Sequence, residues 1–248
     1  MLWREQCRGW VRKYNPVKPE HSAGLHHYGF MRRLSELLPD NAIIVSDTGG
    51  NVIMMGHCFQ SKSGQRIFTS NGNTPMFFAM CGAIGAWFAD PTRPIFCIIG
   101  DGGMSGNIQE LQTIVHYGVN LKIFVINNHC LGNTRAYQVQ NGKQELACGP
   151  DGYSCPDFVK VALAYGIEAR SLKSLEEIPD VLSLQGAVVC DVVHDMFCDY
   201  QPRMTLWQAG IEEGFPLLPE AEFEENMIVG PLEGWRERRK QYRGMPSV

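Results

Sequence analysis

Four continuous apolar runs of strand length recur along this chain of 248 residues, and helix-length segments separate them. The runs lie at residues 42–46, 94–99, 121–126 and 187–193. A strand that is apolar throughout is buried on both faces, which occurs when helices cover both sides of a parallel sheet. The sequence therefore predicts an α/β fold, a doubly wound parallel sheet with helices on both faces.

The segments beside these runs divide the chain into parts. Helices are predicted at residues 25–38, 76–89, 107–117 and 156–165. We expect three parts: an N-terminal helix and linker over residues 1–21, the sheet domain over 22–195 and a C-terminal extension over 196–248. The basic run at 236–240 in the extension is typical of a solvated helix face, and an anion or partner contact is the alternative.

Composition and charge exclude several classes of protein. The formal net charge is −4, from 22 basic and 26 acidic residues, so no general field for nucleic acid is present. No apolar run approaches the length of about 18 residues that a membrane span needs. The nine cysteines are scattered and form no CxxC pair, which is typical of reduced thiols in a cytoplasmic protein and unlike a disulfide framework or a zinc site.

Three of the predicted strands end in small, polar or acidic residues, at 47–51, 100–103 and 127–130. Ligands of open α/β sheets bind beyond the carboxyl ends of the strands, so we expect these clusters to form one site. Asp101 offers a carboxylate and Asn128 an amide oxygen, hard ligands that suit Mg²⁺ in company with phosphate oxygens and water. A helix that begins near residue 107 would add free N–H groups for an anion.

Two common phosphate motifs are absent. The glycines around Asp101 lack the GxGxxG spacing of a dinucleotide site, and no Gly-Lys-Ser/Thr of a P-loop occurs. The spacing to the next cluster is more specific, because residues 103 to 126, which are 24, separate Gly100-Asp101-Gly102 from Asn127-Asn128. This resembles the signature of thiamine diphosphate (ThDP) enzymes. Residues 69–86, 107–111, 127–132 and 156–160 are also similar to the C-terminal diphosphate-binding domain of acetolactate synthases, and the resemblance covers roughly residues 22–195.

The resemblance implies a site for ThDP and Mg²⁺. Asp101 and Asn128 would bind Mg²⁺ through their side chains, and Cys130 through its backbone carbonyl. Met76 would pack beneath the thiazolium, and its N–H together with the Thr74 carbonyl would hold the aminopyrimidine. The other residues implied to contact the cofactor are Thr48, Gly49, Gly50, Asn51, Gly100, Gly102, Gly103, Leu131 and Gly132. Gly50-Asn51 stands where acetolactate synthases commonly have Gln-His.

The substrate side of the site departs from the family. Asn133, Thr134 and Tyr137 replace the Met, Val and Trp that face the substrate in acetolactate synthases. Three apolar positions have gained hydrogen-bonding groups, and buried polar groups must be paired. Such a pocket is expected to favour a polar acceptor over an alkyl one.

The resemblance also implies that this domain is half of an active site. In the family, the glutamate that protonates the aminopyrimidine belongs to a separate pyrimidine-binding domain, so no catalytic residue is expected in this chain. We expect a split enzyme, a heterotetramer with a subunit that supplies the glutamate, which decarboxylates a 2-oxo acid and transfers the two-carbon unit to an acceptor. A simple 2-oxo acid decarboxylase and a non-catalytic interaction module with the ThDP fold are the alternatives.

Overall fold

The computed structural model describes residues 2–141, 144–195, 200–204 and 212–242. The chain forms two compact units, residues 1–198 and 199–248. Within the described ranges, no helix is both long enough and apolar enough to cross a membrane.

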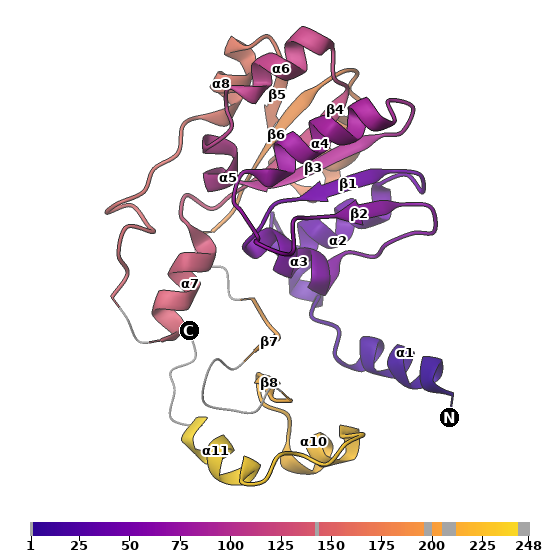
Figure 1. Ribbon diagram of the computed structural model, residues 1–248, viewed down its shortest axis with the longest axis vertical. Coiled ribbons are helices and arrows are strands. Elements are labelled where there is room, and N and C mark those ends of the chain that lie inside the picture. The colour runs from indigo at the N-terminus through magenta and orange to yellow at the C-terminus, as the bar shows by residue number, and fades with distance from the viewer. Residues whose placement is uncertain (1, 142–143, 196–199, 205–211, 243–248) are drawn as a thin grey trace. The chain divides into compact units, whose positions relative to one another are not determined.

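The first unit contains one sheet of six parallel strands in the order β2-β1-β3-β4-β6-β5 (Figure 1). The strands are β1 Ile43–Ser46, β2 Arg66–Phe68, β3 Ile95–Gly100, β4 Leu121–Asn127, β5 Glu168–Ser171 and β6 Val188–Val193. The four predicted apolar runs form the four inner strands, β1, β3, β4 and β6. Strands β2 and β5 lie at the two edges, are partly exposed and were not predicted, because an edge strand needs no apolar run.

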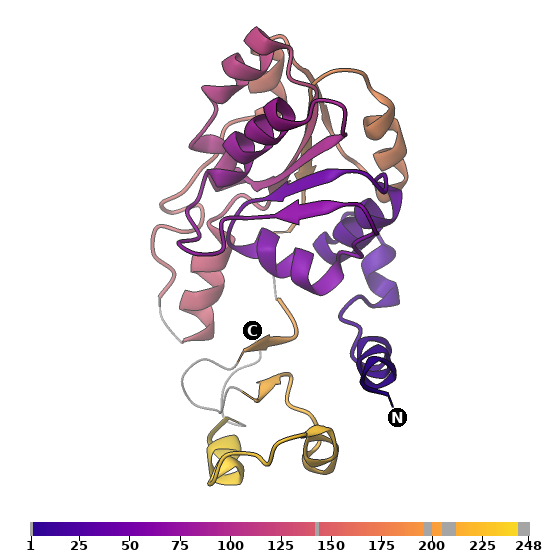
Figure 2. The same cartoon turned by 45° about the vertical axis from the view of Figure 1, so that its right-hand side comes forward.

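Helices pack on both faces of the sheet (Figures 1 and 2). On one face, α4 (Phe78–Ala89), α6 (Glu110–Tyr117) and α8 (Phe158–Ala164) enclose a core with side chains such as Val45, Cys97 and Ile123. On the other face lie α2 (His27–Leu37) and α3 (Gly50–Cys58), and the ring of Phe30 on α2 contacts Phe124 of β4 with 5.6 Å between centroids. The predicted doubly wound α/β fold is confirmed.

Local signals begin and end these helices. The Asp157 carboxylate accepts the Lys160 N–H at 3.0 Å and caps the start of α8, while Gly118 ends α6 with a φ of +63°. The predicted helix at 107–117 begins later, at Glu110, and a separate short helix starts at Asp101. The other elements of this unit are α1 Trp3–Lys13, α5 Asp101–Ser105, α7 Gly132–Gln140, α9 Ile178–Ser183 and 3-10 turns at Pro19–Ser22 and Leu175–Glu177.

Strand order places the three polar clusters together. The chain passes from β1 to β2 on one side and then returns to β3 on the other, so β1 and β3 are neighbours at a topological switch point. Ser46 pairs with Ile98, and Gly100 pairs with Ile126, so the carboxyl ends of β1, β3 and β4 lie side by side. Ligands of open α/β sheets bind at such a point.

The second unit contains the antiparallel strands β7 (Arg203–Met204) and β8 (Gly214–Phe215) and the helices α10 (Glu220–Asn226) and α11 (Trp235–Tyr242). The expectation that the basic run 236–240 is solvated is wrong for Arg239, which is 2% exposed. Its guanidinium lies near the rings of Phe223 and Trp235, and its Nε lies 3.8 Å from Glu213 Oε2. The other residues of the run are exposed or half-buried.

Two histidines, the buried His27 and the half-buried His194, link α2 to the end of β6. The ring centroids of His27 and His194 lie 5.5 Å apart, and the backbone N–H of His194 donates to the Asn127 carbonyl at 3.0 Å. Burial and the neighbouring histidine rings lower the pKa of His27 to about 2, and burial lowers the pKa of His194 to about 4. Both imidazoles are therefore neutral at pH 7.

Replacing Phe124 with alanine is expected to lower the free energy of unfolding by about 3–5 kcal/mol, because it leaves a cavity against Phe30. Phe88→Ala is the matched control, since the Phe88 side chain is 52% exposed and its loss should cost much less. Urea denaturation of the two variants measures the difference. Similar costs for both variants would contradict the assigned core.

The stability of the first unit is expected to fall below pH 6.5. An unfolded histidine titrates near 6.5, whereas folded His27 titrates near 2, so the unfolded chain binds more protons in this range. His27 then contributes a loss of about 1.4 kcal/mol per pH unit below about pH 6, or about 2 kcal/mol between pH 7 and pH 5. The urea midpoint should fall less between pH 7 and pH 5 for His27→Gln than for the wild type. An equal fall in both would show that His27 is not the group responsible.

Candidate functional site

Three helices begin where three of the four inner strands end (Figure 1). Helix α3 begins at Gly50 after β1, α5 at Asp101 after β3, and α7 at Gly132 after β4. The helix predicted to begin near residue 107 begins at Glu110 as α6, and the helix that directly follows β3 is the short α5. The first N–H groups of a helix have no partner within it, so the starts of α3 and α7 favour an anion at this edge of the sheet.

Asp101 is a buried acid at the centre of this edge, with 3% of its surface exposed. Its Oδ1 accepts the Gly102 N–H at 2.8 Å, whereas its Oδ2 is buried and makes no hydrogen bond to any described residue. Burial raises the pKa of Asp101 to about 6, although the N–H groups of Gly102 and Cys130 oppose that shift. A buried carboxylate oxygen without a partner is costly unless another group satisfies it.

Gly102 brings together three side chains from distant parts of the chain. A Cβ on Gly102 would lie 2.9 Å from Leu131 Cδ2, 3.1 Å from Met76 Cε and 3.7 Å from the Tyr153 hydroxyl. The predicted cofactor residues Met76, Gly102 and Leu131 are therefore neighbours. Met76 is 41% exposed, and the predicted Thr74 lies two residues before it in an exposed turn, with a φ of +44°.

Asp47 holds the start of α4 against α5. Its carboxylate accepts the N–H groups of Phe77 and Phe78, each at 3.2 Å. A Cβ on Gly103 would lie only 2.1 Å from Asp47 Oδ2, so position 103 must be glycine for this contact. Burial raises the pKa of Asp47 in spite of these N–H groups. The group that lies close to the Gly103 backbone is therefore the Asp47 carboxylate of this chain.

The predicted loop Thr48 to Asn51 lies beside both other clusters. Gly49 precedes α3 with a φ of +75°, a conformation that glycine adopts without strain. The Asn51 side chain is buried, donates to the Thr48 carbonyl at 3.3 Å and lies 3.4 Å from the position of a Cβ on Gly100. The equivalent Cβ position on Gly49 is 3.5 Å from Asn133 Cβ. The loop therefore borders both Gly100 and the start of α7.

The turn after β4 is fixed by Asn127. The Asn127 amide donates to Asp191 Oδ1 at 3.0 Å, and its Oδ1 accepts the His129 N–H at 3.2 Å. The predicted metal ligands Asn128 and Cys130 flank His129 and are both buried. Asn127 is thus a structural residue of this turn.

The predicted substrate residues share one side of α7. Asn133, Thr134 and Tyr137 are spaced as helix neighbours, and all three are exposed. Between them, Arg135 is buried and forms two hydrogen bonds with Glu145, at 2.8 and 2.9 Å. The polar side of α7 therefore faces outward next to the loop that contains Gly49.

The donor set at this edge fits a hard cation bound with an anion. The partnerless Asp101 Oδ2 is the atom that a divalent cation would satisfy, and Mg²⁺ takes oxygen ligands of this kind. Among the described residues, no group of three or more His, Cys, Asp or Glu side chains could hold a metal. The predicted ligands are one carboxylate, one amide and one backbone carbonyl, so the predicted site is not a cluster of this type.

Sequence reasoning assigned no role to two residues of this site. Asp47 belongs to the predicted cluster 47–51, but its contact with α4 and Gly103 depends on tertiary structure. Tyr153 lies in an irregular segment with no periodic pattern, and no sequence signal marks it.

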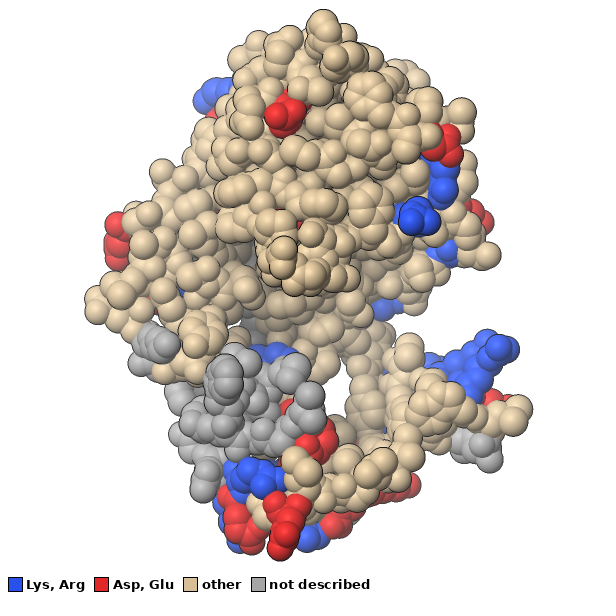
Figure 3. Space-filling model, viewed as in Figure 1, with Lys and Arg blue, Asp and Glu red and all other residues tan. Residues whose placement is uncertain are grey.

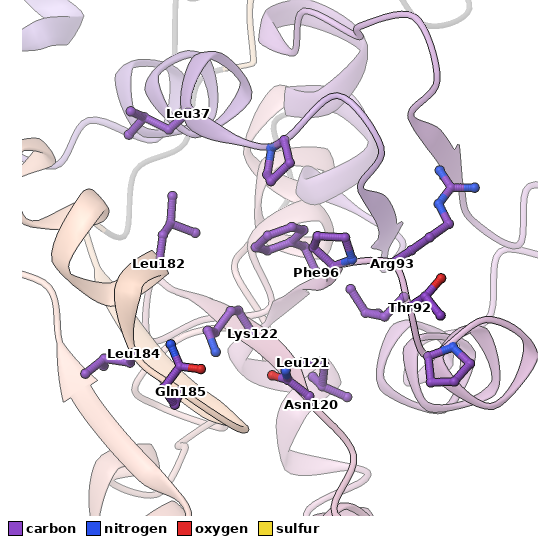
Figure 4. Close-up of a pocket in the computed structure, with 14 residues that line it drawn as sticks. Leu37, Thr92, Arg93, Phe96, Asn120, Leu121, Lys122, Leu182, Leu184 and Gln185 are labelled. Atoms are coloured by element: carbon purple, nitrogen blue, oxygen red, sulfur yellow. The ribbon is translucent and has the colours of Figure 1, made fainter.

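A pocket of about 360 Å³ lies at the opposite end of the strands from the candidate site, at the amino ends of β3 and β4 (Figure 4). Leu37, Phe96, Leu121, Lys122, Leu182 and Gln185 are among its lining residues. The Lys122 ammonium donates to the Gly186 carbonyl at 2.5 Å. None of the predicted site residues lines this pocket.

Comparison with known proteins agrees with the resemblance. The family model described as "Thiamine pyrophosphate enzyme, C-terminal TPP binding domain" matches residues 47–192. Probable acetolactate synthase large subunits of Methanococcus aeolicus and Methanocaldococcus jannaschii are each 35% identical, over 76% and 67% of this chain and 32% and 28% of their own lengths. The acetolactate synthase large subunit of Cyanidium caldarium is 29% identical over 77% of this chain and 33% of its own length.

These matches define what the chain is and how much of its relatives it represents. The chain spans about a third of the length of the curated relatives that it matches. The matched region begins directly after β1 and contains β3, β4 and all three clusters at the carboxyl ends of these strands. The chain belongs to the thiamine diphosphate enzymes, in which it is an acetolactate synthase-like C-terminal diphosphate-binding domain.

Proposed function

We propose that this chain is the diphosphate-binding subunit of a split, cytoplasmic ThDP enzyme that decarboxylates a 2-oxo acid and transfers the two-carbon unit to an acceptor. The observation that carries the proposal is the buried Asp101 carboxylate, with one oxygen lacking a partner, beside Gly102 and Met76 in a ThDP-binding domain. The names of the acetolactate synthase relatives support carbon–carbon bond formation as the reaction class.

The residues of this edge divide the binding of the cofactor among them. Asp101 and Asn128, with the Cys130 carbonyl, hold Mg²⁺, and Gly102 lets the diphosphate approach the backbone. Met76 supports the thiazolium, and its exposed position leaves room for a ligand above it. The Thr48–Asn51 loop and the starts of α3 and α7 supply N–H groups to the diphosphate. ThDP supplies the nucleophilic carbon and the electron sink for decarboxylation.

The acceptor is proposed to be polar. Asn133, Thr134 and Tyr137 lie together on the exposed side of α7 next to the Gly49 loop, so they border the entrance of the site. Their amide and hydroxyl groups would pair with hydroxyl groups of an acceptor. An alkyl acceptor would offer no hydrogen-bonding group to these side chains, which disfavours it relative to a hydroxylated one.

A second subunit is proposed to cover α4 and supply the glutamate. Helix α4 contains no charged residue, and Phe77 and Phe88, at 41% and 52% exposed, lie at its two ends. The Phe88 ring contacts that of Tyr117 on α6, which is 55% exposed. Figure 3 shows few charged side chains on this face of the first unit. A helix that is apolar on all sides is normally buried, so this face favours a protein partner.

ThDP with Mg²⁺ is expected to raise the melting temperature of the wild-type chain, and Asp101→Asn is expected to abolish most of that rise. Saturation at about 100 times Kd adds roughly 2.7 kcal/mol, which corresponds to several degrees in a chain of this size. Asp180→Asn, an exposed position on α9, is the control and should keep the full rise.

Thermal shift measurements, with and without the partner, distinguish the alternatives. A rise that Asp101→Asn retains would contradict the assigned metal site. No rise in the wild-type chain, even with the partner present, would favour the non-catalytic interaction module.

Phe88→Glu is expected to prevent assembly with the partner while leaving the fold intact, because it places a charge on the apolar face of α4. Sedimentation of the chain mixed with a subunit that carries the pyrimidine-binding domain should give a heterotetramer for the wild type and separate species for Phe88→Glu. Val229→Glu, at another exposed apolar position, should assemble normally. Assembly and ThDP-dependent decarboxylation that survive Phe88→Glu would rule out this face. Full activity of the single chain without a partner would refute the split site.

A further inference from the structure

We propose that the Tyr153 hydroxyl is a further binding group of this site, a hydrogen-bond donor to the anion that lies over Gly102. The inference rests on the proposed function, in which that anion is the diphosphate of the cofactor. It assigns a role to a residue outside the strand-end clusters.

The Tyr153 hydroxyl and Asp101 Oδ2 border the same space. The hydroxyl oxygen is buried and lies 3.7 Å from the position of a Cβ on Gly102. It is close enough to Asp101 and Ser105 for both to affect the Tyr153 pKa, but it forms no hydrogen bond of full geometry with a described residue. Asp101 Oδ2 is also buried and also forms no hydrogen bond of full geometry with a described residue. Buried polar groups nearly always have a partner, so two such atoms beside one glycine indicate a bound polar ligand.

The chemistry of the two atoms separates their roles. Asp101 offers an acceptor to a cation, whereas the phenol offers a proton to an acceptor. Once a metal ion takes the Asp101 oxygen, the phenol proton can be donated to an oxygen of the ligand. The Ser105 hydroxyl donates its own proton to the Asp101 carbonyl at 2.8 Å, so towards the phenol Ser105 acts only as an acceptor and it offers no proton to the anion. A hydrogen bond from the hydroxyl to a charged oxygen is of the strong, charge-assisted kind.

The segment before Tyr153 is anchored to α7. Residues 144–155 form an irregular segment that returns along this helix. The Leu131 N–H donates to the Cys148 carbonyl at 2.7 Å, and the Gln138 side chain forms hydrogen bonds with both backbone groups of Leu146, at 2.8 and 3.3 Å. The Arg135–Glu145 pair adds a third anchor.

The backbone turn at the end of this segment then fixes Tyr153 itself. The Tyr153 N–H donates to the Gly149 carbonyl at 2.8 Å. A Cβ on Gly152 would lie 2.5 Å from Ala147 Cα, so the turn is closely packed. The segment is therefore built to hold the Tyr153 ring in place beside Gly102.

Tyr153→Phe tests the proposal, because it removes only the hydroxyl. Calorimetric titration of the full chain with inorganic pyrophosphate and Mg²⁺, and separately with ThDP and Mg²⁺, should show Kd rising about tenfold or more for both ligands. Tyr165→Phe, at the tyrosine directly after α8, is the matched control and should leave both Kd values within about twofold.

Metal binding without the anion separates a ligand contact from a structural effect. Mn²⁺ followed by its electron paramagnetic resonance signal should bind wild type and Tyr153→Phe equally, since the hydroxyl contacts the anion. An equal loss of Mn²⁺ and pyrophosphate affinity would overturn the proposal, because Tyr153 would then act through Asp101.

The remaining outcomes distinguish this inference from the proposed function. If the wild type binds both anions and Tyr153→Phe binds them equally well, the role of Tyr153 is wrong and the cofactor site stands. If the wild type binds neither anion, both are wrong.

Discussion

The buried Asp47 carboxylate is the interaction on which the arrangement of the site depends. It receives the N–H groups of Phe77 and Phe78 and lies directly against Gly103. One side chain at the end of β1 thereby fixes the start of α4, the position of Met76 just before it and the path of the chain after Asp101. Loss of this acid would leave two partly buried N–H groups without their acceptor and would release the segment that carries Met76.

Parallel strand order converts this local contact into a site. The switch point between β1 and β3 places the carboxyl ends of these two strands side by side, and β4 adds a third strand end. Electrostatics then favours one class of ligand. The starts of α3 and α7 carry partial positive charge, whereas Asp101 is a buried acid whose pKa rises to about 6. Positive helix ends and a lone acid together suit an anion that brings its own cation, which describes a diphosphate with Mg²⁺.

The parts that sequence reasoning predicted share a strong physical signal, and the parts that it missed lack one. The inner strands are buried on both faces, so their apolar runs predicted them, and Asp101 and Asn128 follow such runs directly. Strand β5, Glu168–Ser171, is half-exposed and has no run. Helices α3, α5 and α7 begin at or beside the three polar clusters, whose glycines are typical of turns, so their starts were not predicted. Arg239 is buried through tertiary contacts with Phe223 and Glu213, which a basic run cannot reveal.

Two features of the first unit are costly in the isolated chain, and the proposed ligand and partner would relieve both. Polar atoms of Asp101 and Tyr153 are buried without partners, and the aromatic surface at Phe77, Phe88 and Tyr117 is exposed. Ligand binding would satisfy the first, and a protein partner would bury the second. Phe77 joins the two features, because Asp47 accepts its N–H and also lies against Gly103 of α5, the helix that begins at Asp101. A partner that covers α4 would therefore reach the exposed Met76, so assembly and cofactor binding are expected to stabilise each other.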